Sequence, residues 1–241
     1  MWSYVMLAGF IAELIDSSLG MAYGVISNSI LLSLGFGAAL ASATVHSSEV
    51  FLTIASGLSH IRLGNMDRKL FLSLLIPGST SAVLGAYVLS SVDTSFLKPL
   101  IQSYLIMMGV LIILRSRGVV VKGLRVRPSL LGFIGGFLDA TGGGGWGPVV
   151  TGTLIANGSD VRKTIGSVNA SEFFVTVSQT ITFLIFSKVS WDYTLFLLVG
   201  GIPSAFLGAY LCSRIKRDKL MTIVGMAIIV INTYGIMIKI V

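Results

Sequence analysis

Apolar residues form six long runs along the chain, and polar residues interrupt two further apolar regions. Each long run is close to or above the roughly 20 residues that a helix needs to cross about 30 Å of hydrocarbon. The runs cover residues 39–61, 70–91, 96–114, 164–187, 193–213 and 220–240. We therefore predict six transmembrane helices.

The two interrupted regions have the pattern of paired short helices around a polar break. The first pair covers residues 2–16 and 24–36, and the second covers 129–139 and 148–157. At 1.5 Å per residue, an arm of 10 to 15 residues reaches only about 15–22 Å, which is too short to cross alone. Each pair is therefore either one broken helix that crosses once or a hairpin that returns to its own side.

The distribution of positive charge separates these two alternatives. If each pair returns, 14 Lys and Arg residues lie on one side of the membrane and 3 on the other. If each pair crosses once, the division is 10 against 7. The positive-inside rule favours two re-entrant hairpins with the basic loops in the cytoplasm. Two full crossings per pair give the same charge pattern, and only the short arms argue against them.

A constant step of 123 residues relates two parts of the chain. Gly-Phe-Ile at 9–11 recurs at 132–134, and Leu-Gly-Ala-Tyr at 84–87 recurs at 207–210. A hairpin plus three spans crosses the membrane an odd number of times, so the two copies are predicted to have opposite orientation and both termini to lie outside. The predicted units are a first repeat at 1–115, a basic cytoplasmic linker at 116–128 and a second repeat at 129–241.

Composition agrees with a membrane location. Hydrophobic residues make up 54% of the 241 residues and charged residues 11%, against about 25% charged in a soluble domain. The net charge of +7 would suit a nucleic-acid partner, but the basic residues cluster between apolar runs, which is a topology signal. We predict an all-α integral membrane protein with an inverted repeat, each half a re-entrant helical hairpin plus three transmembrane helices. Such a duplicated unit with matched polar breaks is typical of secondary transporters.

The breaks have the chemistry of an anion site. Gly142–Gly145 allow a sharp turn, and Pro148 suits a helix start. All Lys and Arg lie in loops or at span ends, so unpaired amides at the start of each second arm, together with hydroxyls, are expected to hold the anion. Glycines that serve only close helix packing are the alternative. The expected anion-binding residues are Ser17, Ser18, Gly20, Tyr23, Gly24, His46, Ser47, Thr141, Gly142, Gly143, Gly144, Gly145, Trp146, Gly147, Asn169 and Ser171.

Five acidic residues lie inside the predicted membrane segments: Glu13, Asp16, Glu49, Asp139 and Glu172. A charged acid at the bilayer centre costs several kcal/mol, and loss of hydration favours its protonated form. The matched pairs Asp16/Asp139 and Glu49/Glu172 are therefore predicted to carry protons or to bind a coupling ion. Helix capping is the alternative for the aspartates, and a protonated acid bonded to backbone is the alternative for the glutamates. Glu13 has no counterpart, and its role stays open.

Metal, cofactor and enzyme functions are not predicted. His46 lies three residues before Glu49 on one helix face, but the other histidine, His60, is near the end of that span. We therefore predict no metal site and no cofactor. The spans contain no nucleophile–base pair or zinc-ligand motif, which argues against an enzyme. An uncoupled channel, or a carrier for another small anion, is the alternative to a coupled transporter.

From Asp139 to Pro148 the chain reads Asp-Ala-Thr-Gly-Gly-Gly-Gly-Trp-Gly-Pro, which resembles the TauE/SafE family of sulfite exporters and sulfonate permeases. The resemblance covers essentially the whole chain. It implies transport of small sulfur-containing anions such as sulfite, thiosulfate or organosulfonates, and we expect this transport to be export. It also implies a bacterial or archaeal inner membrane, with the anion and the lipid bilayer as partners and a homodimer left open. The first break departs from the pattern, with two glycines where the second has five.

Overall fold

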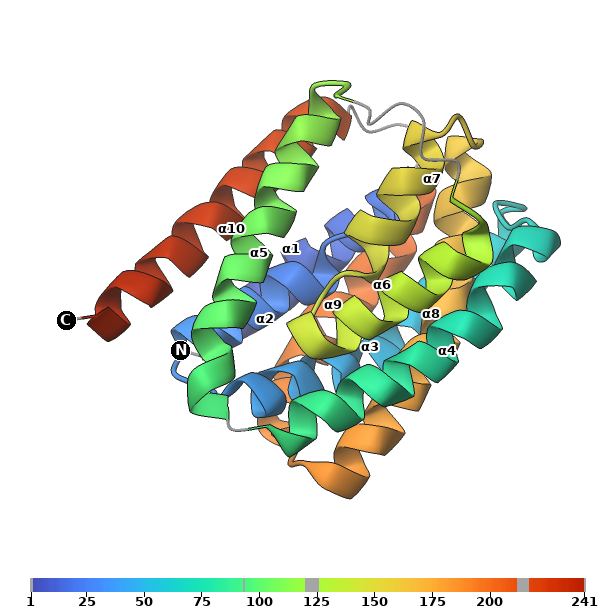
Figure 1. Ribbon diagram of the computed structural model, residues 1–241. Coiled ribbons are helices and arrows are strands. Elements are labelled where there is room, and N and C mark those ends of the chain that lie inside the picture. The colour runs from blue at the N-terminus through green and yellow to red at the C-terminus, as the bar shows by residue number, and fades with distance from the viewer. Residues whose placement is uncertain (1, 93, 120–125, 212–216, 241) are drawn as a thin grey trace.

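The computed structural model describes residues 2–92, 94–119, 126–211 and 217–240, and its regular secondary structure in these ranges is helical (Figure 1). The helices are α1 (Trp2–Leu19), α2 (Tyr23–Ser33), α3 (Ala38–Arg62), α4 (Arg68–Ser91), α5 (Thr94–Ser116), α6 (Pro128–Gly142), the π-helical turn η1 (Gly147–Thr151), α7 (Gly152–Ala156), α8 (Val161–Phe186), α9 (Trp191–Leu211) and α10 (Arg217–Ile240). The predicted all-α membrane fold is confirmed.

The six predicted spans coincide with α3, α4, α5, α8, α9 and α10, apart from residues 212 and 213, which lie outside the described residues. Within the described ranges, four stretches are long and apolar enough to cross a membrane: α3, α4, Leu97–Ser116 of α5, and α9. In α10 the apolar stretch is Met221–Met237. Helix α8 has the length but carries several buried polar residues, among them Asn169, Glu172 and Gln179. Its polar face is therefore turned inward.

Both breaks are shorter than the sequence indicates, and the arm ends predicted at residues 16 and 139 are wrong by three residues. Helix α1 continues to Leu19 and α6 to Gly142, so each aspartate lies in the last helical turn. The chain leaves each helix through a glycine in the left-handed region, Gly20 and Gly143, both with φ of 69°. Glycine adopts this conformation without the steric cost that a Cβ atom brings. These two glycines are 123 residues apart, so the two breaks start with the same backbone geometry.

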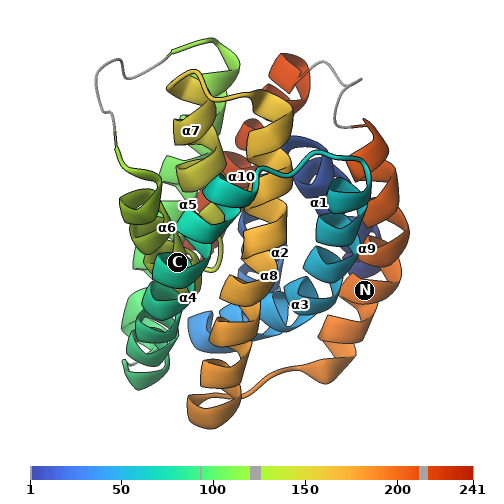
Figure 2. The ribbon, with the colours of Figure 1, turned by 90° about the vertical axis from the view of Figure 1, so that its right-hand side faces the viewer.

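Helix packing follows the internal repeat. Helix α1 packs along α9 and α6 along α4, while α3 pairs with α8 and α5 with α10. Figure 1 shows α5 and α10 side by side, and Figure 2 shows α8 between α4 and α3. Exchanging each helix for its counterpart in the other half leaves this set of pairs unchanged.

Each hairpin begins and ends near the same part of the molecule. In the first, Trp2 packs on Phe196 with ring centroids 4.4 Å apart, and Phe36 packs on Tyr193 at 4.8 Å, so both ends lie beside the start of α9. In the second, Val126 before α6 and Asn157 after α7 line one cavity. The chain therefore doubles back within both hairpins.

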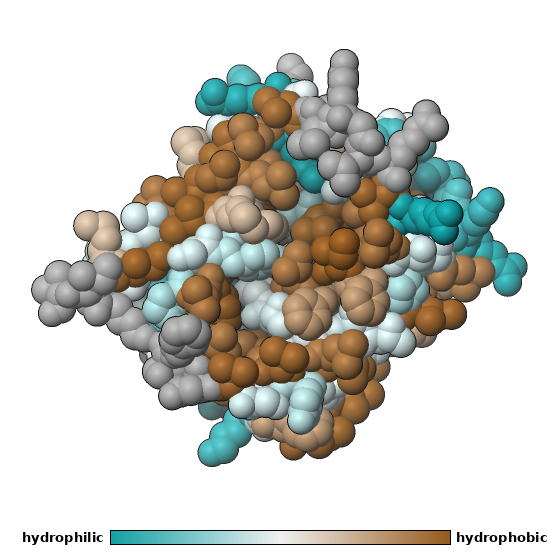
Figure 3. Space-filling view, in the orientation of Figure 1, coloured by the Kyte–Doolittle hydropathy of each residue, from teal (hydrophilic) through white to brown (hydrophobic). Residues whose placement is uncertain are grey.

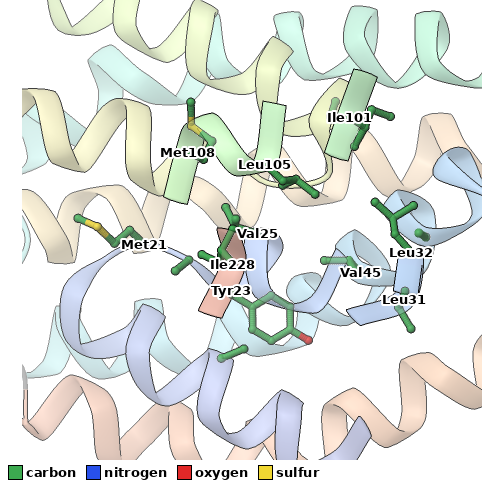
Figure 4. Packing of buried hydrophobic residues seen from close by; sticks show 14 of the residues in the cluster. Met21, Tyr23, Val25, Leu31, Leu32, Val45, Ile101, Leu105, Met108 and Ile228 are labelled. Atoms are coloured by element: carbon green, nitrogen blue, oxygen red, sulfur yellow. The ribbon is translucent and has the colours of Figure 1, made fainter. Parts of the chain in front are cut away.

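The surface is apolar and the interior is rich in polar groups. Exposed side chains include Ile76, Ile185 and Val230, which are 65%, 68% and 67% exposed. Figure 3 shows hydrophobic residues dominating one face, with the strongly hydrophilic ones mainly near its edges. A buried apolar cluster that includes Val25 and Leu105 joins α2 to α5 and α10 (Figure 4). This arrangement suits a lipid-facing exterior around a polar centre.

Candidate functional site

The two breaks touch each other in the middle of the fold. A Cβ atom added to Gly24 would lie 2.9 Å from the Cα atom of Gly144 and 3.2 Å from the carbonyl oxygen of Gly143. The side-chain amide of Asn28 donates to the carbonyl oxygen of Gly142 at 3.0 Å. The backbone of one hairpin therefore lies directly against that of the other, and a side chain would keep them apart.

Asp139 connects the second break to α8. Its Oδ1 atom accepts hydrogen bonds from the backbone amides of Gly145 and Trp146, at 2.8 and 2.9 Å. Its Oδ2 atom accepts from Nε2 of Gln179 at 2.8 Å. Because Asp139 lies in the last turn of α6, its carboxylate reaches across the break to the first amides of the next arm.

Asp16 makes the corresponding bond in the first break with fewer partners. Its Oδ1 atom accepts from the backbone amide of Tyr23 at 3.2 Å. We expected the amides of Tyr23, Gly145 and Trp146 to be unpaired. Instead, each donates to a carboxylate of the protein, as expected if the two aspartates cap the second arms. A coupling role for either aspartate stays a prediction.

His46 joins the two halves at the same place. Its Nδ1 atom contacts a carboxylate oxygen of Glu49, and its Nε2 atom lies 3.2 Å from the backbone oxygen of Asp139. The Nδ1 atom is also 3.8 Å from Oδ2 of Asp139. All three residues are buried, and in the described part of the chain His46 is the only basic residue that forms an ion pair with these acids.

His46, Glu49 and Asp139 also offer ligand atoms within 4.8 Å of one another. Spacing along the sequence indicates only ligands on the same helix as His46, whereas Asp139 belongs to the other repeat. Both oxygens of Asp139 already accept hydrogen bonds, and Nδ1 of His46 already contacts Glu49. The cluster is thus satisfied by protein donors, and it does not by itself indicate a metal.

The remaining buried acids lie near His46, Glu49 and Asp139, and we call this whole group of residues the polar centre. Glu13 accepts a hydrogen bond from the hydroxyl of Ser17, one turn along α1. Glu172 lies close enough to Asp16, Glu49 and Asp139 for electrostatic interaction. The acids of the two repeats therefore form one buried group. Buried acids that lie so close together cannot all be charged at once without a large energetic cost.

Two cavities approach the breaks from opposite ends of α5. A cavity of about 230 Å³ lies near the start of α5 at Leu97 and is lined by Thr141 and Gly142 of the second hairpin. A cavity of about 260 Å³ lies at the other end of α5, around Arg115, and is lined by Leu19 and Met21 of the first hairpin. Each break is thus adjacent to one cavity.

The sequence pattern of the family described as "Sulfite exporter TauE/SafE" matches residues 5–234. The chain belongs to the TauE/SafE family. It is 42% identical to "Probable membrane transporter protein YtnM" of Bacillus subtilis (strain 168) over 242 residues, 93% of this chain and 79% of the relative. It is 27% identical to "Probable membrane transporter protein ORF9" of Sinorhizobium sp over 237 residues, 95% of this chain and 88% of the relative. No solved structure matches the chain.

Membership of the TauE/SafE family confirms the resemblance found at Asp139–Pro148 and the prediction of a multi-pass membrane transporter rather than an enzyme. A membrane transporter implies a small-molecule substrate and a surrounding lipid membrane. The family name refers to sulfite, and the names of both relatives refer to membrane transport without a substrate.

Several predicted anion-binding side chains of this TauE/SafE protein donate to carbonyl groups of their own helix. Ser47, Ser171 and Thr141 donate to the backbone oxygens of Ala43, Ser167 and Phe137, and Ser18 and Asn169 do the same. Asn169 also accepts from Ser56 of the other repeat at 3.2 Å. Gly147 lies against Met21 of the first break. The binding roles of these residues stay predictions.

Other residues of the centre were missed. Gln179 lies two turns after Glu172 on the same face of α8, a spacing that the sequence does show. Ser48 is within 2.7 Å of the hydroxyl of Tyr23, and Tyr104 donates to the carbonyl oxygen of Gly144 at 3.0 Å. Tyr104 lies in an apolar run with no local sign of its partner. Trp146, which was predicted as a site residue, is fully buried and packs against Gly78 of α4, and its binding role stays a prediction.

Proposed function

We propose that this TauE/SafE transporter exports a small sulfur-containing anion, such as sulfite, thiosulfate or an organosulfonate, across a bacterial or archaeal inner membrane by alternating access. The observation that carries the proposal is the contact between two matched breaks at a buried polar centre, with a separate cavity near each break at opposite ends of α5. The family name supports the sulfur assignment.

The membrane topology that we propose has inverted halves, with the basic loops in the cytoplasm and both termini outside. The Nζ atom of Lys163, at the start of α8, donates to the carbonyl oxygen of Gly64 after α3 at 2.8 Å. Arg115, Val126 and Asn157 line one cavity, which brings the ends of α5 and α7 together with the start of α6. These contacts support one basic end, as the positive-inside rule requires.

We propose that the anion binds beside the breaks, near Tyr23–Gly24 and Gly142–Gly147. A repeat-related pair of half-helix N-termini next to a broken backbone is a common location for substrates in secondary transporters. Rocking of one half against the other would then expose this place first to one cavity and then to the other. Glycine at the contact allows such movement without collision of side chains.

Transport by the purified protein in liposomes tests the proposed function. We expect radiolabelled sulfite to leave loaded vesicles in a saturable manner, with unlabelled thiosulfate or sulfoacetate competing and phosphate not competing. Competition by phosphate alone would contradict the sulfur assignment. A flux well above roughly 10³ ions per second through each protein molecule would instead indicate the uncoupled channel. Empty liposomes and heat-treated protein serve as controls.

Proton coupling is a separate part of the proposal and rests on Glu49 and Glu172. We expect Glu49→Gln and Glu172→Gln each to lower pH-gradient-driven flux at least about tenfold, because each removes a titratable group from the buried centre. Equilibrium exchange of labelled sulfite should fall less, since exchange needs no net proton movement. Asp192→Asn, at an exposed acid that begins α9, is the matched control. Unchanged pH dependence in both glutamine variants would rule out coupling through these residues.

A further inference from the structure

Arg115 is half-buried, whereas arginines such as Arg62, Arg68 and Arg117 are exposed. It occupies the last turn of α5, where its Nη2 atom donates to the hydroxyl of Thr153 at 2.9 Å. A Cβ atom added to Gly152 would lie 2.5 Å from the guanidinium carbon, so only glycine leaves room for this side chain. The start of α7 thus serves as a platform for the guanidinium.

The guanidinium nitrogen nearest Gly152 is Nη1, which is not the one that donates to Thr153. The Nη1 atom of Arg115 is buried, and no hydrogen-bond acceptor for it occurs among the described residues. A buried donor left unpaired costs free energy, and the cost is larger when the group is charged. The structure therefore holds a cationic donor for which the described residues supply no acceptor.

Arg115 lines the cavity of about 260 Å³ at the basic end of the molecule, which we call the basic-end cavity. Leu19 and Met21 of the first break line the same cavity, together with Gly152 and Asp218. One water molecule occupies about 30 Å³ of liquid, so the space can hold a small oxyanion with part of its hydration shell. In the described residues Arg115 and Asp218 form no ion pair, so Asp218 does not neutralise the arginine directly.

A second unpaired group lies beside Gly20 of the first break. The hydroxyl of Thr151 is buried without a hydrogen-bond partner among the described residues. A Cβ atom added to Gly20 would lie 3.2 Å from that hydroxyl oxygen, and Gly20 stands between the cavity-lining residues Leu19 and Met21. Unpaired polar groups therefore continue from the cavity toward the first break.

We propose that the basic-end cavity is a loading site in which Arg115 binds a small oxyanion before it passes to the polar centre. The proposal rests on the proposed function, because it takes the transported anion as the ligand. A planar guanidinium with free N–H groups matches two oxygens of a sulfite-like group. Among the described residues, those that are buried at the polar centre include no Lys or Arg, so a cation at its edge attracts the anion without trapping it inside.

The phosphate of an anionic lipid has the same chemistry as a free oxyanion. We favour the free anion because three of the residues that line the cavity, Leu19, Met21 and Gly152, are buried in the fold. Measurements in detergent without added lipid, and in vesicles with and without anionic lipid, separate the two sources.

The test compares Arg115→Gln with Arg117→Gln, an exposed arginine two residues further along the chain. We expect R115Q to raise the KM for sulfite supplied from the basic end at least about tenfold, with kcat changed less than about twofold, because a charge-assisted contact is lost before the rate-limiting step. R117Q should match wild type, and Arg115→Lys should fall between the two. An equal KM change from both sides of the membrane, or none, would overturn the loading site.

A binding measurement keeps the result independent of transport. Sulfite should raise the Tm of the wild-type protein in lipid-free detergent, and R115Q should lose most of this rise while R117Q keeps it. If R115Q does not fold, Gly152→Ala provides the same test, because it displaces the guanidinium and retains its charge. Sulfite stabilisation without sulfite transport would reject the proposed function and leave the site standing. A Tm rise kept in both R115Q and G152A, or produced only by anionic lipid, would reject the site.

Discussion

Replacing Asp139 with alanine is expected to remove sulfite transport and to lower the free energy of unfolding by at least about 3 kcal/mol. The substitution leaves three buried donors without an acceptor: the amides of Gly145 and Trp146 and the side chain of Gln179. Each unpaired buried donor costs about 1–3 kcal/mol. Loss of the carboxylate also breaks the link through Asp139 between the start of the second arm and α8. Thermal unfolding in detergent and flux in liposomes measure the two effects.

Asp16→Ala is the matched control, because the repeat-related carboxylate accepts a single backbone bond, from Tyr23. We expect its stability loss to be about a third of that of Asp139→Ala. Asp139→Asn should be milder than alanine, since Gln179 can turn its unpaired Oε1 atom toward the new amide. Equal losses in Asp139→Ala and Asp16→Ala would show that the three bonds of Asp139 carry no additional stability.

Gly144→Ala is expected to have the second large effect, with a stability loss of at least about 3 kcal/mol and a corresponding loss of transport. Gly144 has φ of 148°, which L-residues rarely adopt, and this strain alone costs about 1–3 kcal/mol. The added Cβ atom would also lie 2.6 Å from the carbonyl carbon of Gly24 and 2.9 Å from the Cα atom of Val25. Backbone atoms of the first break would have to move, so the two hairpins would separate.

Gly158→Ala isolates the conformational part of this cost. Gly158 also has a positive φ, 86°, but nothing lies within 4 Å of the added Cβ atom. We expect a loss of about 1–2 kcal/mol for this control, with transport retained. The difference in Tm between the two variants measures the cost of pushing the breaks apart. If the two alanine variants unfold at the same temperature, close contact between the breaks contributes nothing to stability.

The long helices were predictable because length and hydropathy alone determine them. A run of about 20 apolar residues has few alternatives to a helix in lipid, whatever packs against it. The two breaks were also located from sequence, since glycines and acids together interrupt otherwise apolar regions there. Their limits were misplaced by three residues. Nothing local shows that Asp16 and Asp139 sit in the last turn and reach forward across the break.

The partners of the polar centre were not predictable in the same way. His46 contacts Glu49 on its own helix, which spacing indicates, but its contact with Asp139 comes from the other repeat. Hydroxyls such as Ser47 look available in sequence, yet a helix carbonyl one turn away satisfies them. The position of Arg115 against Gly152 depends on how α5 meets α7, which no periodicity reveals.

The carboxylates that hold the start of each second arm have a consequence for any ligand of those amides. Asp16 and Asp139 compete with any incoming anion for these backbone amides. Because the two carboxylates are tethered to the chain, each has a millimolar or higher effective concentration at the amides. An incoming anion must exchange with a resident one that never diffuses away. We therefore expect any occupancy of these amides by an anion to be brief, which favours rapid turnover over tight retention.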